Sequence, residues 1–485
     1  MKRPLWRWSA TEVVAATSSG RVNCREVAEA VLGRIETLNG RVNAVTLRLD
    51  DQARAAARRL DDAFARGERP GPLHGVPVTI KDNVDVAGQR TPNGLPALAG
   101  LIAPDDSPVT RNLLGAGAVL VGRTNTPEVS MRPTTNNPLF GLTRNPWSDD
   151  ISCGGSSGGA GAAVLAGMCA IGHGNDVGGS IRIPALHCGI PGLKPSQGRV
   201  PAFVPSAAGE RPTVAALMSV QGPLARTVAD LRLGLAAMAA PDPRDPWFVP
   251  SPLTGACDGF GDHDGHRPPG RAALLRGLAG HPTHPRVLAA LDRAAAALAT
   301  AGYEVVEVDD LDTPGVERAA RLAFRLLMTD LDHQLTPVLD SSGSREMRLY
   351  WGQVLHLEKA CTTVPDYIDA LAERTTLQRA WAAFLARYPL LVAPQLLGGL
   401  LAVDEDIRSE EHARAAWLSL MPSIAVNLLG LPSVLAPTGL DEAGMPSGVQ
   451  LIGPRLREDL CLAAAEVVEA AVPSVPDLFA ERLTA

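Results

Sequence analysis

The sequence contains Gly154-Gly-Ser-Ser-Gly-Gly159 and, shortly afterwards, Asp176-Val-Gly-Gly-Ser-Ile-Arg-Ile-Pro184. Each segment places a serine among glycines, and Ser180 follows Ser156 by 24 positions. Glycine lets the backbone approach a ligand closely and leaves N–H groups exposed to it. The second segment is therefore a candidate oxyanion hole, a set of donors for an oxygen that becomes negative. Its donors would be the N–H groups of Val177, Gly178, Gly179 and Ser180.

A serine hydroxyl needs a base within hydrogen-bond reach before it attacks a carbonyl. His173 and His187 are near in the sequence, but neither lies in a recognisable catalytic motif. Lys81 is the better candidate, because it follows the short β-branched run Val76-Pro-Val-Thr-Ile80, which predicts a buried strand. Burial would lower the pKa of this lysine and leave the amine neutral. Ser156 can then pass a proton from Ser180 to Lys81.

Alternating strands and helices along the chain predict an α/β architecture. Two capping boxes, Ser9-Ala-Thr-Glu12 and Asn23-Cys-Arg-Glu26, predict that the first 65 residues are mostly helical. Further strands are expected at Ala118–Val121, Tyr303–Val308, Leu390–Ala393 and Ser447–Ile452, and helices at Ala160–Ala170, at His284–Gly302 and within Glu317–Arg387. The first of these helices has small or apolar residues on all faces, so we expect it at the centre of the molecule.

One domain, residues 1–485, is the simplest organisation, since no repeat of 20 to 50 residues is present. We divide it into an N-terminal helical region (1–65), a catalytic core (66–240), an exposed loop (241–285), a variable helical substrate region (286–420) and a C-terminal return to the core (421–485). The loop includes Asp262-His-Asp-Gly-His266, whose side chains are potential metal ligands but fit a solvated loop better.

Composition narrows the possible partners. The net charge of −7 and the pI of about 5.8 disfavour nucleic acid as a partner, because a negatively charged surface repels the phosphate backbone. The seven cysteines are scattered and odd in number, which fits reduced thiols in the cytoplasm. No apolar run has the length of a signal peptide core or of a membrane span, so we expect a cytoplasmic protein. The sequence leaves the oligomeric state open, with a homodimer as one option.

Together, these segments resemble the amidase signature family. The resemblance rests on Val78-Thr-Ile-Lys-Asp-Asn83, on both serine segments, on Gly122-Arg-Thr-Asn-Thr-Pro-Glu128 and on Gly192-Leu-Lys-Pro-Ser196, and it resumes at Gly444-Met-Pro-Ser-Gly-Val-Gln-Leu-Ile-Gly-Pro454. It implies one large α/β domain, with a mixed, twisted central sheet flanked by helices on both faces. It also implies that Ser180 is the acyl-enzyme nucleophile, Ser156 a bridging serine in a cis peptide and Lys81 the base, with no cofactor.

The sequence departs from the family pattern in three places. Cys153 stands near where a proline is common, Ala160 replaces a serine, and Asn175 replaces a threonine or serine. The implied activity is hydrolysis of a small-molecule carboxamide, of aryl, acyl or carbamate type. We expect Met131, Cys153 and Gly154 to line the substrate pocket. The resemblance is weak over the predicted helices of Glu317 to Leu400. These helices would add the apolar side chains of Phe324, Leu327, Met328, Tyr350, Trp351 and Leu355 to the pocket, although such stripes usually belong to the core.

Several alternatives remain open at this stage. The first serine segment also fits the Gly-x-Ser-x-Gly nucleophile elbow with Ser156 attacking, but the residues before it, Trp147-Ser-Asp-Asp-Ile-Ser152, are too polar for the apolar strand that an elbow requires. A glycine-rich turn or phosphate cradle lacks the Gly-Lys-Ser/Thr that would follow. The ammonia-generating catalytic subunit of glutamyl-tRNA amidotransferases shares the signature, and a catalytically silent binding protein would leave the three matched residues unexplained.

Overall fold

The computed structural model describes residues 3–253 and 270–482. Its strands are β1 (Val45–Arg48), β2 (Pro77–Lys81), β3 (Val119–Thr124), β4 (Ile171–Asp176), β5 (Gly192–Lys194), β6 (Val220–Ala225), β7 (Arg271–Leu275), β8 (Glu304–Val308), β9 (Leu390–Ala393), β10 (Ser433–Leu440) and β11 (Pro446–Ile452). They form one 11-stranded sheet in the order β1-β3-β2-β4-β6-β5-β10-β11-β9-β7-β8 within these ranges. The sheet is mixed: β2 runs parallel to β3 and β4, whereas β10 is antiparallel to β5 and β11.

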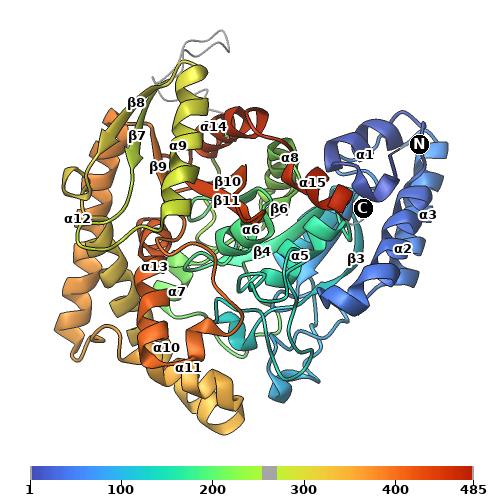
Figure 1. Ribbon diagram of the computed structural model, residues 1–485. Coiled ribbons are helices and arrows are strands. Elements are labelled where there is room, and N and C mark those ends of the chain that lie inside the picture. Colours follow the sequence, from blue (N-terminus) through green and yellow to red (C-terminus); the bar gives the residue numbers. More distant parts are fainter. Residues whose placement is uncertain (1–2, 254–269, 483–485) are drawn as a thin grey trace.

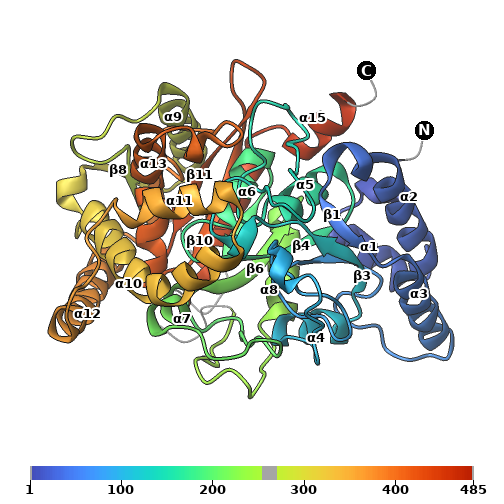
Figure 2. The same cartoon turned by 90° about the horizontal axis from the view of Figure 1, so that it is seen from below.

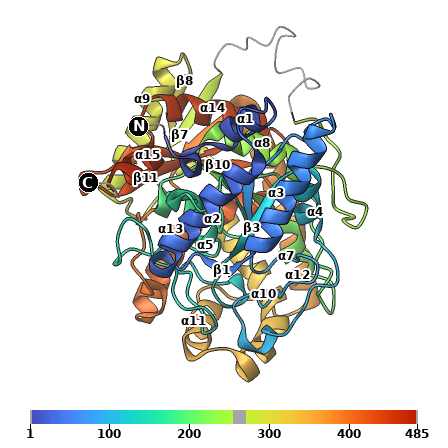
Figure 3. The same cartoon turned by 90° about the vertical axis from the view of Figure 1, so that its right-hand side faces the viewer.

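The helices are α1 (Ala10–Thr17), α2 (Cys24–Val42), α3 (Asp50–Ala65), α4 (Pro108–Gly115), α5 (Gly158–Ala166), α6 (Arg182–Cys188), α7 (Thr213–Met218), α8 (Val228–Met238), α9 (Pro285–Thr300), α10 (Val316–Ser342), α11 (Arg345–Leu355), α12 (Val364–Arg387), α13 (Glu410–Leu429), α14 (Glu458–Ala470) and α15 (Val475–Arg482). Figure 1 shows α1, α2 and α3 at one end of the molecule and α10, α11 and α12 at the other. The view from below separates the same two groups (Figure 2). In the third view α2 and α3 lie over the edge of the sheet near β3 (Figure 3).

Helices cover both faces of the sheet because its strands are apolar on both sides. Leu390 and Val392 of β9 pack into one hydrophobic cluster with residues of α8, α9 and α14. Leu391 and Ala393, the intervening residues, pack into another with residues of α10, α12 and α13. Alternate side chains of a strand point to opposite faces, so this short apolar run needs cover on both. A further cluster holds α2, α5 and α6.

Most of the predicted elements are present with small shifts in their ends. Both capping boxes form, at the starts of α1 and α2. The central helix α5 is buried at every position, as its composition predicts, and it ends early because Gly167 adopts a left-handed conformation with φ of 79°.

Strands β1, β4, β5, β6 and β10 were not predicted from the sequence, and of these strands β4 matters most for the candidate site. Of its residues, Ile171-Gly-His-Gly-Asn-Asp176, only Ile171 is β-branched, and the two glycines, Asn175 and Asp176 are types that strands usually disfavour. The predicted loop over 241–285 is also wrong in part, because β7 (Arg271–Leu275) lies within it. The run Asp262-His-Asp-Gly-His266 lies outside the described residues.

Candidate active site

Lys81 is the last residue of β2 and has no solvent-exposed surface. The amine Nζ lies within hydrogen-bond distance of Ser156 Oγ, at 2.7 Å, and donates to Asn175 Oδ1 at 2.7 Å. Burial lowers the pKa of Lys81 well below its ordinary value, although the Asp176 carboxylate opposes part of that change. A buried lysine with a lowered pKa is available as a neutral base. The structure thus brings together two of the three predicted catalytic residues.

Ser156 lies in a loop whose flanking glycines, Gly155 and Gly159, have no room for a side chain. The Gly155–Ser156 peptide bond is cis. A Cβ atom on Gly155 would lie 2.4 Å from the carbonyl oxygen of Arg132, and one on Gly159 would lie 2.4 Å from the backbone nitrogen of Asn125. Both distances are far below van der Waals contact. The glycines of this segment therefore let the loop and the start of α5 press against the chain on either side.

Ser180 lies in the turn between β4 and α6. Ser157 N–H donates to the carbonyl oxygen of Ser180 at 3.1 Å, which joins the two serine segments through their backbones. Within residues 3–253 and 270–482, no hydrogen bond joins Ser180 Oγ to Ser156 Oγ. Ser180 is a partly exposed residue, whereas Ser156 is buried. The nucleophile candidate thus lies at the edge of the site that solvent and substrate can reach.

A buried ion pair holds this turn. Asp176 accepts from Gly179 N–H at 2.7 Å and from Ile181 N–H at 3.0 Å. Arg182 forms a salt bridge with Asp176 at 3.1 Å, and neither side chain is exposed. Burial alone would raise the pKa of Asp176, but the adjacent Arg182 guanidinium brings it below its ordinary value. The pair therefore braces the turn in its charged form.

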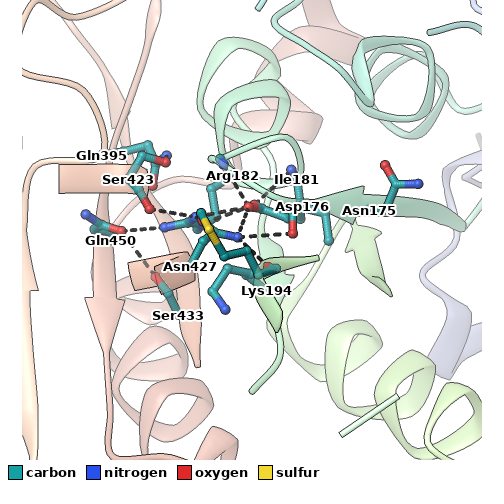
Figure 4. A network of polar contacts seen from close by, with 12 residues as sticks. Asn175, Asp176, Ile181, Arg182, Lys194, Gln395, Ser423, Asn427, Ser433 and Gln450 are labelled. Atoms are coloured by element: carbon teal, nitrogen blue, oxygen red, sulfur yellow. Dashed lines mark hydrogen bonds and ion pairs between the residues drawn. The ribbon is translucent and has the colours of Figure 1, made fainter. Parts of the chain in front are cut away.

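The bracing extends across the sheet, as Figure 4 shows. Arg182 donates to Gln450 Oε1 at 2.9 Å and to Asn427 Oδ1 at 2.6 Å, and Asn427 Nδ2 donates to Asp176 Oδ1 at 2.9 Å. These partners belong to β11 and α13. This turn is thus fixed by residues about 250 positions away in the sequence.

One of the four N–H groups predicted as oxyanion donors, that of Gly179, is already used within the turn. Gly179 N–H points at Asp176 and is used there. The N–H groups of Val177, Gly178 and Ser180 make no hydrogen bond within the described part of the chain, and these three residues are partly exposed while Gly179 is buried. Gly179 adopts φ of 121°, and a Cβ there would lie 2.3 Å from Ser423 Oγ. Gly179 is therefore needed for the shape of the turn.

Met131 lies in a segment fixed at both ends, residues 128–132. Glu128 carboxylate accepts from Ser344 N–H at 2.9 Å, and Arg132 forms a buried salt bridge with Asp406 at 2.9 Å. Between these two clamps Val129 has φ of 46°, an unfavourable value for a β-branched residue. Val129 and Met131 are partly buried against the helical cluster of α10 to α13. The segment therefore joins the catalytic core to those helices.

The remaining predicted pocket residues differ in exposure. Cys153 has no exposed surface, and burial raises the pKa of its thiol to about 12, so this side chain belongs to the interior. Gly154 is also buried. Four of the apolar residues from the weakly matched helices are core: Phe324, Leu327, Met328 and Trp351. Tyr350 and Leu355 remain partly exposed.

The two nearby histidines are structural. His173 Nδ1 accepts from Lys81 N–H at 3.4 Å and its Nε2 contacts Gln221 Oε1 at 2.7 Å, while His187 Nδ1 contacts the Ser152 carbonyl at 2.8 Å. Burial lowers the pKa of His173 to about 3 and that of His187 to about 4. Among the hydrogen bonds of the described residues, none joins a histidine to Ser156. The geometry therefore gives Ser156 no histidine base, which the nucleophile elbow would require.

Sequence comparison agrees with this architecture. The family model described as Amidase matches residues 26–462. An indoleacetamide hydrolase of Bradyrhizobium diazoefficiens is 45% identical over 480 residues, covering 96% of this chain and 87% of that protein. A glutamyl-tRNA(Gln) amidotransferase subunit of Synechococcus is 34% identical over 486 residues, covering 96% and 95%. The crystal structure of a bacterial aryl acylamidase of the amidase signature family superposes with a TM-score of 0.83 at 28% identity, covering 99% of both chains.

The chain belongs to the amidase family. It is a hydrolase of carbon–nitrogen bonds other than peptide bonds, and it acts on a small-molecule amide. The predicted α/β fold with a mixed sheet is confirmed. Along residues 3–253 and 270–482, no helix combines the length and apolar character that crossing a bilayer requires.

Proposed function

We propose that this amidase hydrolyses a carboxamide whose acyl group is aromatic or otherwise apolar, with Ser180 as nucleophile, Ser156 as proton relay and Lys81 as base. The observation that carries the proposal is the 2.7 Å hydrogen bond between the fully buried Lys81 and Ser156, beside the turn that bears Ser180. A neutral amine in that position can draw a proton through one serine from another.

In the proposed reaction, Ser180 Oγ attacks the amide carbon as its proton passes to Ser156 and the Ser156 proton passes to Lys81. The N–H groups of Val177, Gly178 and Ser180 would stabilise the negative oxygen. Collapse of the intermediate breaks the C–N bond, and the protons return along the same path to the leaving nitrogen. Water then attacks the acyl-enzyme, with the same groups acting in turn, and the acid is released.

The substrate class rests on two supports. The indoleacetamide hydrolase is 45% identical across nearly the whole chain. The segment beside the serines also presents apolar side chains, Val129 and Met131, partly buried with Val177 and Tyr350 against the helical cluster. An apolar wall with a few polar groups is the usual form of a small-molecule site. We therefore propose an arylacetamide such as indoleacetamide as the substrate to try first.

A serine-reactive fluorophosphonate followed by peptide mass spectrometry tests the assignment. We expect a single adduct on Ser180, and we expect labelling to fall sharply in Lys81→Ala. An adduct on Ser156 would overturn the assignment of the nucleophile. Release of ammonia from indoleacetamide by the isolated chain tests the substrate class.

The amidotransferase relatives suggest the second candidate function, ammonia supply within a larger assembly. Glutamine hydrolysis that requires two copurified partner chains, with no turnover of arylacetamides by the isolated chain, would favour it.

A further inference from the structure

Asn175 contacts the candidate base directly. Its Oδ1 accepts from Lys81 Nζ at 2.7 Å, the same distance as the Lys81–Ser156 hydrogen bond. Its Nδ2 donates to Asn83 Oδ1 at 2.9 Å. Asp176, the next residue along β4, points into the buried network, whereas Asn175 stands apart from it (Figure 4). Neighbouring side chains of a strand face opposite sides, so β4 braces the nucleophile turn with one residue and reaches the base with the other.

The chemistry of an amide oxygen gives this contact a direction. A neutral lysine amine has two N–H donors and one lone pair, and it must turn the lone pair to Ser156 to take a proton. An amide oxygen only accepts, so it engages one N–H and cannot compete for the lone pair. A hydroxyl at this position can donate as well as accept. The hydrogen bond from Nδ2 to Asn83 sets which end of the Asn175 amide faces Lys81.

The charge of the surroundings explains why a neutral acceptor suits the position. In the described part of the chain, the ionisable side chains around Lys81 include Asp176 and His173 on β4 and the adjacent Asp82. Arg123 on β3 donates to the Lys81 carbonyl at 3.2 Å. Burial favours the neutral amine and the Asp176 carboxylate favours the ammonium. A second carboxylate in contact with Nζ would shift this balance to the ammonium, which cannot act as a base.

We propose that Asn175 is a positioning residue, which holds the Lys81 amine with its lone pair directed at Ser156 and which Asn83 orients in turn. The inference rests on the proposed role of Lys81 as the base. In this scheme Asn175 acts through Lys81, and it contacts neither the substrate nor the Oγ atoms of Ser156 and Ser180. Its effect is on the orientation and protonation of Lys81.

The test is the pH profile of kcat/KM for three variants. In Asn175→Asp the new carboxylate favours the ammonium, so the acid limb should move to higher pH by at least about one unit, with activity recovered in alkaline buffer. Asn175→Leu removes the acceptor, and kcat should fall about 10²-fold at every pH, a loss comparable to that of general-base catalysis. Asn175→Thr keeps an oxygen acceptor for the amine, so its kcat should stay within about tenfold of the parent enzyme.

Asn83→Ala is the matched control, because it removes the hydrogen bond that Asn175 Nδ2 donates to Asn83 and leaves the contact between Asn175 and Lys81 in place. It should reduce kcat only a few-fold and leave the acid limb where it is. An unshifted acid limb in Asn175→Asp, or near-parental kcat in Asn175→Leu, would overturn the inference. If Asn175→Asp does not fold by circular dichroism, the comparison of Leu with Thr decides. Lys81→Ala distinguishes failure of the proposed function from failure of the positioning role. Near-normal turnover in Lys81→Ala would refute the proposed function. An inactive Lys81→Ala together with an unshifted pH profile in Asn175→Asp would refute the positioning role alone.

Discussion

Two regions of the molecule are held in place by different interactions: the nucleophile turn, residues 177–181, which bears Ser180, and the helical wall formed by α10, α11 and α12. The turn after β4 depends on a buried ion pair, with Asp176 and Arg182 joined to side chains of α13 and β11. The helical wall is an apolar cluster, and its ion pairs, such as Arg318–Glu373, are largely exposed. Polar networks in the interior tolerate little change, since each lost partner leaves a buried group unsatisfied, whereas apolar packing tolerates changes that conserve volume. We infer that catalysis is fixed by the first region and that specificity can vary through the second.

The largest difference between the regions should appear in turnover. Ser180→Ala should lower the rate of amide hydrolysis by more than about 10⁴-fold, because it removes the proposed nucleophile. Lys81→Ala should lower it by at least about 10²-fold. Ser341→Ala, at an exposed serine of α10, should leave turnover unchanged. The measurement is ammonia release at saturating amide. Near-normal turnover in either catalytic variant would refute the triad.

Stability should separate the regions next. Arg182→Ala leaves the Asp176 charge buried without its partner, and the free energy of unfolding should fall by about 3 to 5 kcal/mol. Arg318→Ala breaks a pair whose side chains are 59% and 31% exposed, and it should cost less than about 1 kcal/mol. Urea unfolding of both variants provides the comparison. Equal losses would mean that the buried pair does not brace the turn.

Acid should destabilise the catalytic region through its buried histidines. Their pKa values are about 3 for His173 and about 4 for His187 in the folded state, whereas the unfolded chain takes up protons near 6.5. The unfolded state therefore binds more protons as the pH falls from about 6.5 to 4, and each histidine should lower stability by about 1.4 kcal/mol per pH unit in this window. His187→Asn should reduce the slope by that amount, as measured by urea unfolding across the window. His333→Gln, on the exposed face of α10, is the control, and an unchanged slope in His187→Asn would contradict the assignment.

The smallest effect should come from the junction between the regions. Met131→Ala shortens an apolar side chain beside the serines, and kcat/KM for an arylacetamide should fall about tenfold, the scale of a lost contact in an apolar pocket. The change should be in KM, with acetamide hardly affected. Leu349→Ala, at an exposed position of α11, should change neither constant. Equal losses for both amides would place Met131 outside the acyl site.

Several features of the fold and of the candidate site could be predicted from short segments of the sequence. The strand ending at Lys81 was predicted because its apolar run is short and β-branched, and the central helix because all its faces are small or apolar. The glycines around Ser156 indicated close backbone contacts, which the structure shows at Gly155 and Gly159. Such patterns are visible in sequence because the steric and hydrophobic preferences of a short segment do not depend on distant residues.

The rest was decided by contacts between distant parts of the chain. β4 is a strand because β2 and β6 supply its hydrogen bonds, although its own residues disfavour one. The use of Gly179 N–H by Asp176, the burial of Cys153 and the clamps on both sides of Met131 all involve packing that the local sequence does not describe. Asn175 shows this most clearly. The sequence marked it as a departure from the family, and only the pairing of β2 with β4 brings its oxygen within 2.7 Å of Lys81.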